Sequence, residues 1–267
     1  MKTIEKHFDK WRYYKIQPSK EGWSGRTFVK GEAGSIITCT KLEDLEQVLI
    51  DKILKSLPHY FGFDGAKARF LRVCKDGFRS ANYQKERLEK AEAKAMLDKC
   101  APLEKLMTTE VNGIDILRVI QHTELISPVE KARLGVVLKS NLANDFVRGA
   151  AAFAAGDVGT GLVRMKEALK AEKVATWPAV TYLPFLWRPH AHMFLKPEVT
   201  KEYARRVGHP FHFAYSSELT PAVYDQLLDL ARQTEKHISD LRPDDRIDIQ
   251  GFIWVVNRYD EPGRSQG

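Results

Sequence analysis

The first forty residues alternate short hydrophobic runs with turn-forming residues. β-Branched and aromatic residues are concentrated in WRYYKIQ (residues 11–17) and RTFVKGEAGSIITCT (residues 26–40), and glycines punctuate the second run. This pattern is typical of short strands bounded by turns. The sequence therefore predicts two or three short strands, with a turn at Gly31 to Gly34.

From residue 42 onward the hydrophobic positions recur with helical spacing. Thr40 followed by Glu43 predicts a capping box for a first helix that Pro58 ends. We interpret residues 59–68 as a loop and residues 82–99 as a charged, solvent-facing helix. Further helices are predicted at residues 128–140, 142–155, 161–171, 176–187, 199–207 and 221–241. Residues 244–259 fit a helix or a buried strand, because their apolar run is too short to show a period.

These elements predict a mainly α (α+β) fold, in which a helical bundle carries a helix-hairpin-helix element and a small N-terminal antiparallel β element. Residues 1–100 hold the β element and basic helices, and we expect them to pack on a helical domain formed by residues 101–267 as one compact unit. The helices of residues 161–171 and 176–187 are separated only by Glu172 to Ala175. They must therefore form a tight helical hairpin.

The composition indicates a soluble globular protein. The chain has 267 residues, 43% of them hydrophobic, which is enough to bury a full core. Its apolar runs are far shorter than the roughly 20 residues that cross a bilayer, and its first residues contain no apolar signal core. Three cysteines without C-x-x-C spacing predict buried thiols. We expect a cytoplasmic protein, monomeric and without a membrane partner.

The positive charge lies in the N-terminal part of the chain. The formal net charge is +7, and residues 1–100 hold 21 Lys and Arg against 14 Asp and Glu, whereas residues 101–267 hold 21 of each. Aromatic and basic residues alternate through residues 67–90. We interpret this segment as a solvated helix face whose long side chains cover apolar surface, with a nucleic-acid-binding face as the alternative.

The segment KAEKVATWPAVTYLPFLWRPHAHMFLKPEVTKEYARRVG (residues 170–208) resembles the helix-hairpin-helix DNA glycosylases, the superfamily of 8-oxoguanine DNA glycosylase. In that family a G-x-G-x-K-x-A hairpin leads into an apolar helix, and an aspartate then opens a helix with D-x-x-V and A-x-R. Lys173 falls at the family's catalytic lysine, and Val199 falls on the helix after the aspartate. Both hairpin glycines are absent, and Lys196 stands where the family has its aspartate.

The resemblance implies a DNA glycosylase that flips a damaged or modified base out of DNA and excises it, with no cofactor and with DNA as partner. Because the hairpin and the acid differ from the repair enzymes, a phage-type modified base, excised in antiviral defence, is the substrate we consider. Lys173 would be the nucleophile and Lys196 would modulate it or contact phosphate. Asp245 or Asp248 would be the missing acid.

The resemblance also implies two sets of contact residues. We expect a base pocket formed by Trp177, Trp187, His190, His192 and Phe211, although aromatic residues at this density also fit core packing. We expect DNA-backbone contacts from Lys170, Arg188, Lys201 and Arg205.

The histidines leave two other functions open. His190, His192, His209 and His212 could together ligate zinc, which would make the protein a metal-dependent nuclease or hydrolase. Otherwise they are hydrogen-bonded loop or pocket histidines. In a third interpretation the protein is a non-enzymatic nucleic-acid binder, whose affinity depends strongly on salt and does not need Lys173.

Overall fold

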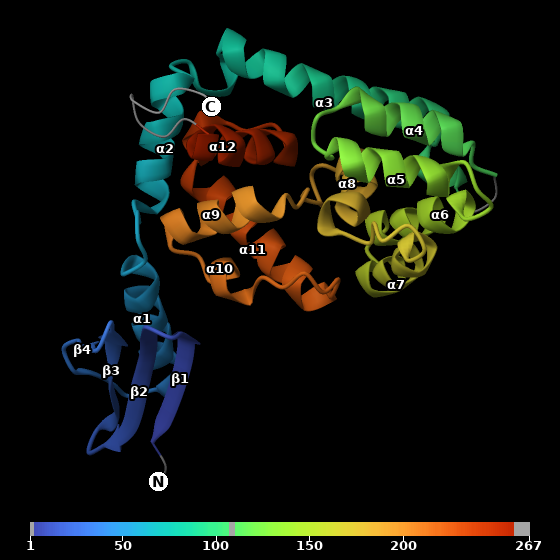
Figure 1. Cartoon of the computed structure of the whole chain (residues 1–267). Helices are drawn as coiled ribbons and strands as arrows, with labels where there is room; N and C mark the ends of the chain where they lie inside the picture. The colour runs from blue at the N-terminus through green and yellow to red at the C-terminus, as the bar shows by residue number, and fades with distance from the viewer. Residues whose placement is uncertain (1–2, 107–109, 259–267) are drawn as a thin grey trace.

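The computed structural model describes residues 3–106 and 110–258 and shows a mainly α protein with a small antiparallel sheet, which confirms the predicted fold class. Figure 1 shows three parts: a β unit at the N-terminus and two groups of helices that one long helix connects. Across the two described segments no helix is long and apolar enough to span a membrane.

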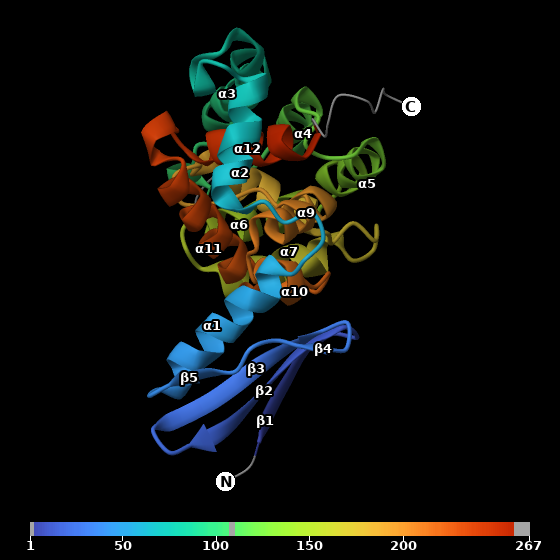
Figure 2. The ribbon, with the colours of Figure 1, turned by 90° about the vertical axis from the view of Figure 1, so that its left-hand side faces the viewer.

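The N-terminal unit is an antiparallel sheet with one helix on one of its faces. Its strands are β1 (Ile4–Asp9), β2 (Arg12–Ser19), β3 (Gly22–Val29), β4 (Glu32–Ala33) and β5 (Ile37–Cys39), and both β4 and β5 pair with β3. Helix α1 (Leu42–Lys55) follows and lies between the sheet and the helical groups (Figure 2). The turn predicted at Gly31 to Gly34 is only partly right, because a turn at residues 30–31 joins β3 to β4 and Glu32–Ala33 form β4 itself.

This unit has a hydrophobic core of its own, separate from the main core. Tyr14 and Ile16 of β2 pack against Leu45 and Leu49 of α1, because alternate strand residues and every fourth helix residue face each other. The predicted capping box is wrong. Lys41 occupies the N-cap position of α1 and makes no side-chain capping hydrogen bond.

The first helical group, which we call lobe A, surrounds the C-terminal helix. It comprises α2 (Gly62–Val73), α9 (Pro197–Val207), α10 (Phe211–Ala214), α11 (Pro221–His237) and α12 (Arg246–Arg258). Residues 244–259, left open between helix and strand, are helical over α12. The loop predicted at residues 59–68 is wrong, since α2 begins at Gly62. Gly62 has a positive φ of 71°, which glycine adopts without strain. Gly62 and Gly65, which are typical of a loop, lie instead in the first turn of α2.

The second group, lobe B, is formed by the middle of the chain. It comprises α4 (Gly113–His122), α5 (Pro128–Leu138), α6 (Ala143–Ala154), α7 (Val158–Leu169) and α8 (Trp177–Trp187). Helix α4 was not predicted, and the others start and end within a few residues of their expected bounds. Helix α6 packs against both α7 and α8 and forms the centre of this lobe.

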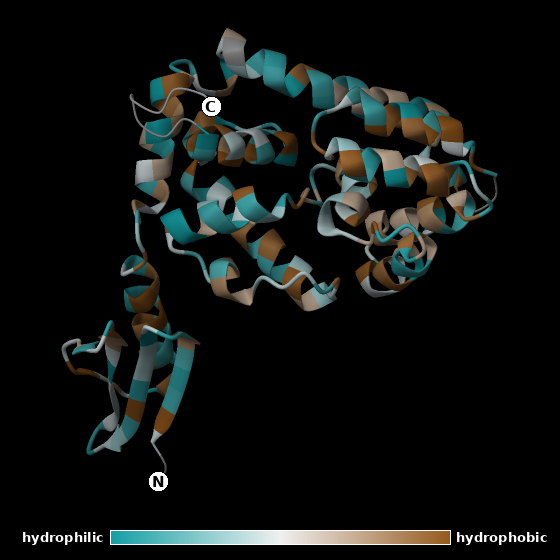
Figure 3. Cartoon of the chain, viewed as in Figure 1, coloured by the Kyte–Doolittle hydropathy of each residue, from teal (hydrophilic) through white to brown (hydrophobic). Residues whose placement is uncertain are grey.

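Helix α3 (Ala81–Cys100) runs across both lobes (Figure 1). It contacts α12 in lobe A and α4 and α8 in lobe B. Its residues are largely hydrophilic (Figure 3), as expected for the charged helix predicted at residues 82–99. One continuous core joins the two lobes beneath α3, so the lobes form a single helical body.

Candidate active site between the two helical lobes

Lys196 lies where the two lobes meet. It occupies the N-cap position of α9, directly after the loop that leaves α8, and its side chain is half-buried. Its Nζ atom lies 4.8 Å from the centre of the Trp254 ring of α12. A positive charge at a helix N-terminus opposes the helix dipole, so Lys196 does not stabilise α9 as a capping residue does.

The surroundings shift the protonation equilibrium of Lys196 toward the neutral amine. Burial lowers the pKa of Lys196 below the ordinary lysine value, and the charges of Lys90 and Arg258 lower it further. The carboxylates of Glu130 and Glu124 act in the opposite direction without reversing the shift. A neutral lysine amine is a nucleophile, whereas the ammonium form is not.

Glu130 is the residue of lobe B whose charge acts on Lys196 at the junction of the lobes. It lies in the first turn of α5 and forms a capping box with Ser127, whose Oγ donates to Glu130 Oε2 at 2.7 Å. Its other oxygen, Oε1, accepts a 2.6 Å hydrogen bond from Thr176, the N-cap residue of α8. These bonds fix the carboxylate between the starts of α5 and α8. Its charge acts on Lys196 across the junction of the lobes.

Lys90 of α3 is a further charged residue that acts on Lys196. Its side chain is almost fully buried, and its Nζ donates to Glu86 Oε1 at 2.5 Å and lies 3.5 Å from Glu89 Oε2. Glu89 in turn accepts a hydrogen bond from the backbone N–H of Glu124. The positive charge of Lys90 is therefore held by carboxylates, and it also acts on Lys196. We call Lys90, Glu130, Thr176, Lys196 and Trp254 the Lys196 cluster.

Lys173 lies at the turn between α7 and α8, as the hairpin prediction required, but its side chain is exposed. Its φ of 51° is left-handed, and the N–H of Val174 donates to the carbonyl of Leu169, which closes the end of α7. Its carbonyl accepts a hydrogen bond from Arg133. Lys166, Lys170 and Lys173 line a shallow surface hollow at this turn. A lysine nucleophile needs surroundings, such as burial, that lower its pKa, and the exposed side chain of Lys173 is not buried.

The expected base-pocket residues are found mostly in the core. Trp177, Trp187, His192 and Phe211 are buried, and the ring nitrogens of the first three have hydrogen-bond partners. Tyr224 and the carbonyl of Ala154 hold the His192 ring. These four side chains therefore pack in the core, as the alternative interpretation of the aromatic residues held. They do not form an open pocket. His190 is exposed.

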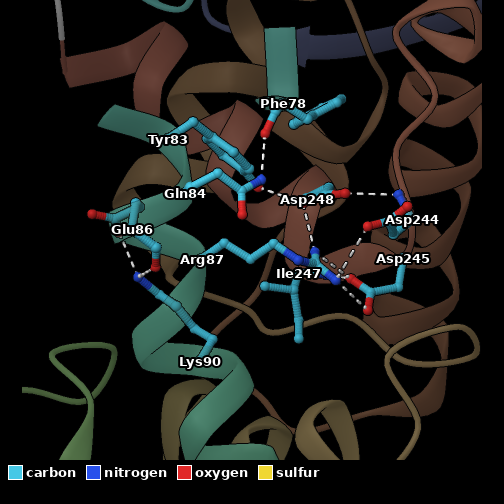
Figure 4. A network of polar contacts seen from close by, with 10 residues as sticks. All are labelled: Phe78, Tyr83, Gln84, Glu86, Arg87, Lys90, Asp244, Asp245, Ile247 and Asp248. Atoms are coloured by element: carbon cyan, nitrogen blue, oxygen red, sulfur yellow. Dashed lines mark hydrogen bonds and ion pairs between the residues drawn. The ribbon is translucent and has the colours of Figure 1, made fainter. Parts of the chain in front are cut away.

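Asp245 and Asp248 belong to a separate polar network between α3 and α12 (Figure 4). Asp248 is buried and accepts hydrogen bonds from Tyr83 at 2.7 Å, from Arg87 at 2.5 Å and from the backbone N–H of Asp244 at 2.7 Å. Asp245 pairs with the same guanidinium at 3.0 Å. Burial raises the pKa of Asp248, and these bonds oppose the rise. With its oxygens engaged in this way, Asp248 is a structural carboxylate rather than the expected acid of Lys173.

The four expected DNA-contacting cations differ in their surroundings. Lys170 and Arg188 are exposed. Lys201 lies 3.7 Å from Glu198 and over the Tyr215 ring. Arg205 is committed to structure, because it pairs with Glu202 and donates to the carbonyl of Pro58, which ties lobe A to the end of the N-terminal unit.

The histidines do not converge on a metal site. His192 contacts Tyr224, and His209 pairs with Asp229 at 3.1 Å. Burial lowers the pKa of His192, His209 and His212. Over residues 3–106 and 110–258 no group of three or more His, Cys, Asp or Glu side chains could hold a metal ion. The metal-dependent alternative therefore finds no ligand set in that part of the chain.

Sequence reasoning missed Glu130 and Lys90. Glu130 carries a signal, because the Ser127-x-x-Glu130 spacing is that of a capping box, but this signal predicts a helix start and no chemistry. Lys90 lies in a helix that looks wholly solvent-facing, and only the packing of α3 over both lobes buries it. A comparison with protein-family models, curated proteins and solved structures finds no match to this chain.

Proposed function

We propose that the protein is a DNA glycosylase that removes a damaged or modified base, with Lys196 as its amine nucleophile. The observation that carries the proposal is a half-buried lysine of lowered pKa where the two helical lobes meet, on which the charge of the fixed Glu130 carboxylate acts. The resemblance of residues 170–208 to helix-hairpin-helix glycosylases supports the same class of reaction. The proposal exchanges the roles first expected of Lys173 and Lys196.

The reaction follows from the groups in the Lys196 cluster. The neutral Nζ atom attacks C1′ of the flipped nucleotide, and the bond between C1′ and the base breaks. The base leaves with the bonding electron pair and takes a proton from solvent, while the attacking nitrogen passes a proton to Glu130 through one water molecule, because Glu130 acts on Lys196 through its charge and makes no direct ion pair with it. The C1′–O4′ bond then breaks as the nitrogen lone pair forms the C=N bond of a protonated Schiff base, and O4′ takes up the proton that Glu130 had accepted. Water hydrolyses this Schiff base. This last step returns the lysine and leaves an abasic site.

The surface around the hairpin fits the DNA backbone. Lys166, Lys170 and Lys173 surround the turn between α7 and α8, and Arg133 is anchored to the carbonyl of Lys173. These side chains supply the positive charge that the missing hairpin glycines would otherwise supply through backbone N–H groups. Lys173 thus becomes a phosphate-contacting residue in the proposal.

Trp254 is the ring best placed to receive a flipped base. It is partly exposed, and Lys196 and Arg258 approach it at 4.8 Å and 5.2 Å from the ring centre. A base stacked on this ring would present its sugar to Lys196. Since Lys196 replaces the family's aspartate, we propose an unusual substrate, such as a modified base in phage DNA excised in antiviral defence.

The test combines base release with chemical trapping of the Schiff base. The full chain is incubated with duplexes that carry oxidised, alkylated, deaminated or phage-type modified bases, and freed bases are detected by mass spectrometry. Sodium cyanoborohydride is added in parallel, so that a Schiff base becomes a stable protein–DNA adduct visible on a denaturing gel. We expect both signals from the wild type and neither from Lys196→Met.

Matched variants separate the roles of the two lysines. Lys173→Met should keep the adduct but require more protein to form it, because only a phosphate contact is lost. Glu130→Gln should slow adduct formation by roughly 100-fold or more, the usual contribution of a general base. An adduct that persists in Lys196→Met and disappears in Lys173→Met would overturn the assignment. Salt-sensitive DNA binding without a freed base from any substrate would identify a non-enzymatic binder instead.

A further inference from the structure

Helices α4 and α5 lie side by side in lobe B (Figure 1) and leave an open groove between them. The groove has a volume of about 350 Å³, and the buried residues Leu117 of α4 and Gly135 of α5 form its floor. Pro128, Ala132 and Val136 also line it. They recur every four residues along α5, so they lie on one face of the helix, and all three are exposed. The apolar side chains that border the groove are therefore open to solvent.

Gly135 keeps the groove open, although the fold does not require a glycine there. It lies inside α5, where glycine weakens a helix relative to alanine. A β-carbon at this position would come no closer than 3.5 Å to its neighbours, the methyl groups of Leu117, which is an ordinary contact distance. By contrast, a β-carbon at Gly149 or Gly161 would lie 2.9 Å or 2.7 Å from the nearest atom. Those two glycines allow close helix packing, whereas Gly135 leaves space between two helices.

Two lysines border the groove, one on each side of Gly135. Lys131 and Lys139 lie four residues before and after it, which places them about 12 Å apart along the helix axis. Within residues 3–106 and 110–258 neither lysine pairs with a carboxylate, and the residues that line the groove include no acid. The groove is therefore apolar along its length and positively charged at both ends.

The acids of the two helices do not compensate these lysines. Helices α4 and α5 carry one acid each, Asp115 and Glu130. Asp115 pairs with Arg118 at 2.6 Å, and Glu130 accepts hydrogen bonds from Ser127 and Thr176. The positive charge of the groove is thus available to an acidic ligand.

We propose that this groove binds an amphipathic helix of a partner protein, with acidic residues at two positions seven or eight residues apart. Such positions lie about 11–12 Å apart along a helix, which matches the spacing of Lys131 and Lys139. Apolar side chains between the two acids lie over Gly135, where the missing β-carbon lets two helices approach closely. A DNA backbone has no apolar face to cover Val136 and Ala132, so the lining favours a protein helix. The proposal does not depend on glycosylase activity, because the groove and the Lys196 cluster share no residue.

The test is fluorescence anisotropy of the full chain with a fluorescein-labelled synthetic peptide of about 18 residues, which forms about five helical turns. The peptide carries leucines at helical spacing along one face and two glutamates, seven residues apart, at the edge of that face. The matched peptide has lysine in place of both glutamates. We expect the acidic peptide to bind at least tenfold more tightly than the matched peptide. Equal binding of the two, or no binding of the acidic peptide at about 1 mM protein, would overturn the proposal.

Gly135→Ala fills part of the groove and leaves the fold intact. Its methyl group meets Leu117 at an ordinary contact distance, so thermal unfolding should occur at the same or a higher temperature. The affinity for the acidic peptide should fall roughly fivefold or more, because the methyl group holds the partner helix away from the floor. A variant that is at least as stable as the wild type and binds the peptide equally well would contradict the proposal.

A second set of variants tests the charge. The double variant Lys131→Gln, Lys139→Gln should weaken binding of the acidic peptide roughly twofold to tenfold. The double variant Lys20→Gln, Lys52→Gln, an equal loss of charge at exposed positions of the N-terminal unit, should bind like the wild type. Lys196→Met should also bind like the wild type, which separates the groove from the proposed active site. Equal affinities of the two double variants would rule out the role of the groove lysines. A wild-type dimer in analytical ultracentrifugation that Gly135→Ala disrupts would make a second copy of this chain the occupant instead of a partner helix.

Discussion

Two ionic clusters lie next to each other beneath α3, and they differ in how completely their charges are satisfied. Arg87 faces α12 and has Asp245 and Asp248 against its guanidinium, with Tyr83 closing the same network. One turn further along α3, Lys90 lies close enough for its positive charge to act on Lys196, so two lysines contribute positive charge at one junction. In the first cluster, which we call the paired cluster, the charged groups are ion-paired and hydrogen-bonded. The second cluster keeps a lysine amine that burial and like charge push toward its neutral form.

The difference separates a structural network from a candidate site. A buried charge is stable when its hydrogen-bonding positions are filled, as those of Asp248 are. Within residues 3–106 and 110–258 the Lys196 amine has no such set of hydrogen-bond partners, and it lies half-buried beside an aromatic ring. Groups held in a costly protonation state are concentrated at functional sites. The sequence analysis had expected the catalytic acid at Asp245 or Asp248, and both residues belong to the paired cluster around Arg87.

The largest expected change in stability comes from a substitution in the paired cluster around Arg87. Asp248→Ala leaves Arg87 with fewer partners and removes the acceptor of Tyr83, so we expect a loss of about 3–5 kcal/mol in the free energy of unfolding. Chemical denaturation at pH 7 measures this loss. The matched control is Asp244→Ala, because Asp244 is exposed and lies 3.8 Å from Arg87. It should cost less than about 0.5 kcal/mol. Equal losses in both variants would remove the distinction between the clusters.

The protonation of Lys196 can be followed by its reactivity. Because only the neutral amine reacts, acetylation by limiting acetic anhydride rises with pH and levels off above the pKa. The lowered pKa places the midpoint for Lys196 below the ordinary value of about 10.4. Below both values, each unit of lowering makes the neutral fraction about tenfold larger. Peptide mass spectrometry across a pH series gives the midpoint, with a lysine in an unstructured peptide as reference.

The same measurement has an internal check. Glu130→Gln removes a carboxylate that raises the pKa of Lys196, so the midpoint should fall further. A midpoint at or above that of the reference peptide, or a rise in the variant, would contradict the description of the Lys196 cluster.

A smaller effect is expected when Lys196 itself is replaced. Lys196→Met removes a charge that is costly to bury and retains an apolar stem against Trp254. The free energy of unfolding should therefore stay within about 1 kcal/mol of the wild type, because lost cation–π attraction and relieved desolvation oppose each other. Denaturation in the same buffer as Asp248→Ala gives the comparison. A loss of several kcal/mol would make Lys196 a structural residue.

The smallest effect concerns the hairpin. Lys173 is in a left-handed conformation, with φ of 51°, which glycine adopts without strain. Lys173→Gly should raise the free energy of unfolding by up to about 1 kcal/mol, while Lys173→Ala should leave it nearly unchanged. Thermal unfolding of the two variants measures the difference. A loss of stability in Lys173→Gly would show that the side chain of Lys173 contributes to packing.

Local patterns predicted the helices well and the site poorly. Helices α5 to α9 were predictable because Pro, Ser, Thr or Asp marks most of their starts and apolar residues repeat with helical spacing. Helix α2 was missed because its glycines resemble a loop. The site joins Lys90, Glu130 and Lys196, which are far apart in the sequence. Their meeting depends on how α3 crosses the lobes, and no local pattern contains that information.

The aromatic residues illustrate the same limit. Trp177, Trp187 and Phe211 looked like pocket residues because they lie near the hairpin, but helical packing turns them into the core. Trp254 is on a segment whose type the sequence left open, and it is the one that lies beside Lys196. The sequence shows which aromatic residues are present, whereas the packing of the helices determines which of their side chains remain accessible.

The separate core of the N-terminal unit has a consequence for the order in which the protein opens. The separate core of this unit is a cluster of four fully buried side chains, Tyr14, Ile16, Leu45 and Leu49, whereas the helical body shares one large continuous core. So few enclosed side chains offset little of the chain entropy of some fifty residues. The amide protons of β1 to β3 should therefore exchange with solvent deuterium through a sub-global opening that leaves α3 and both lobes closed.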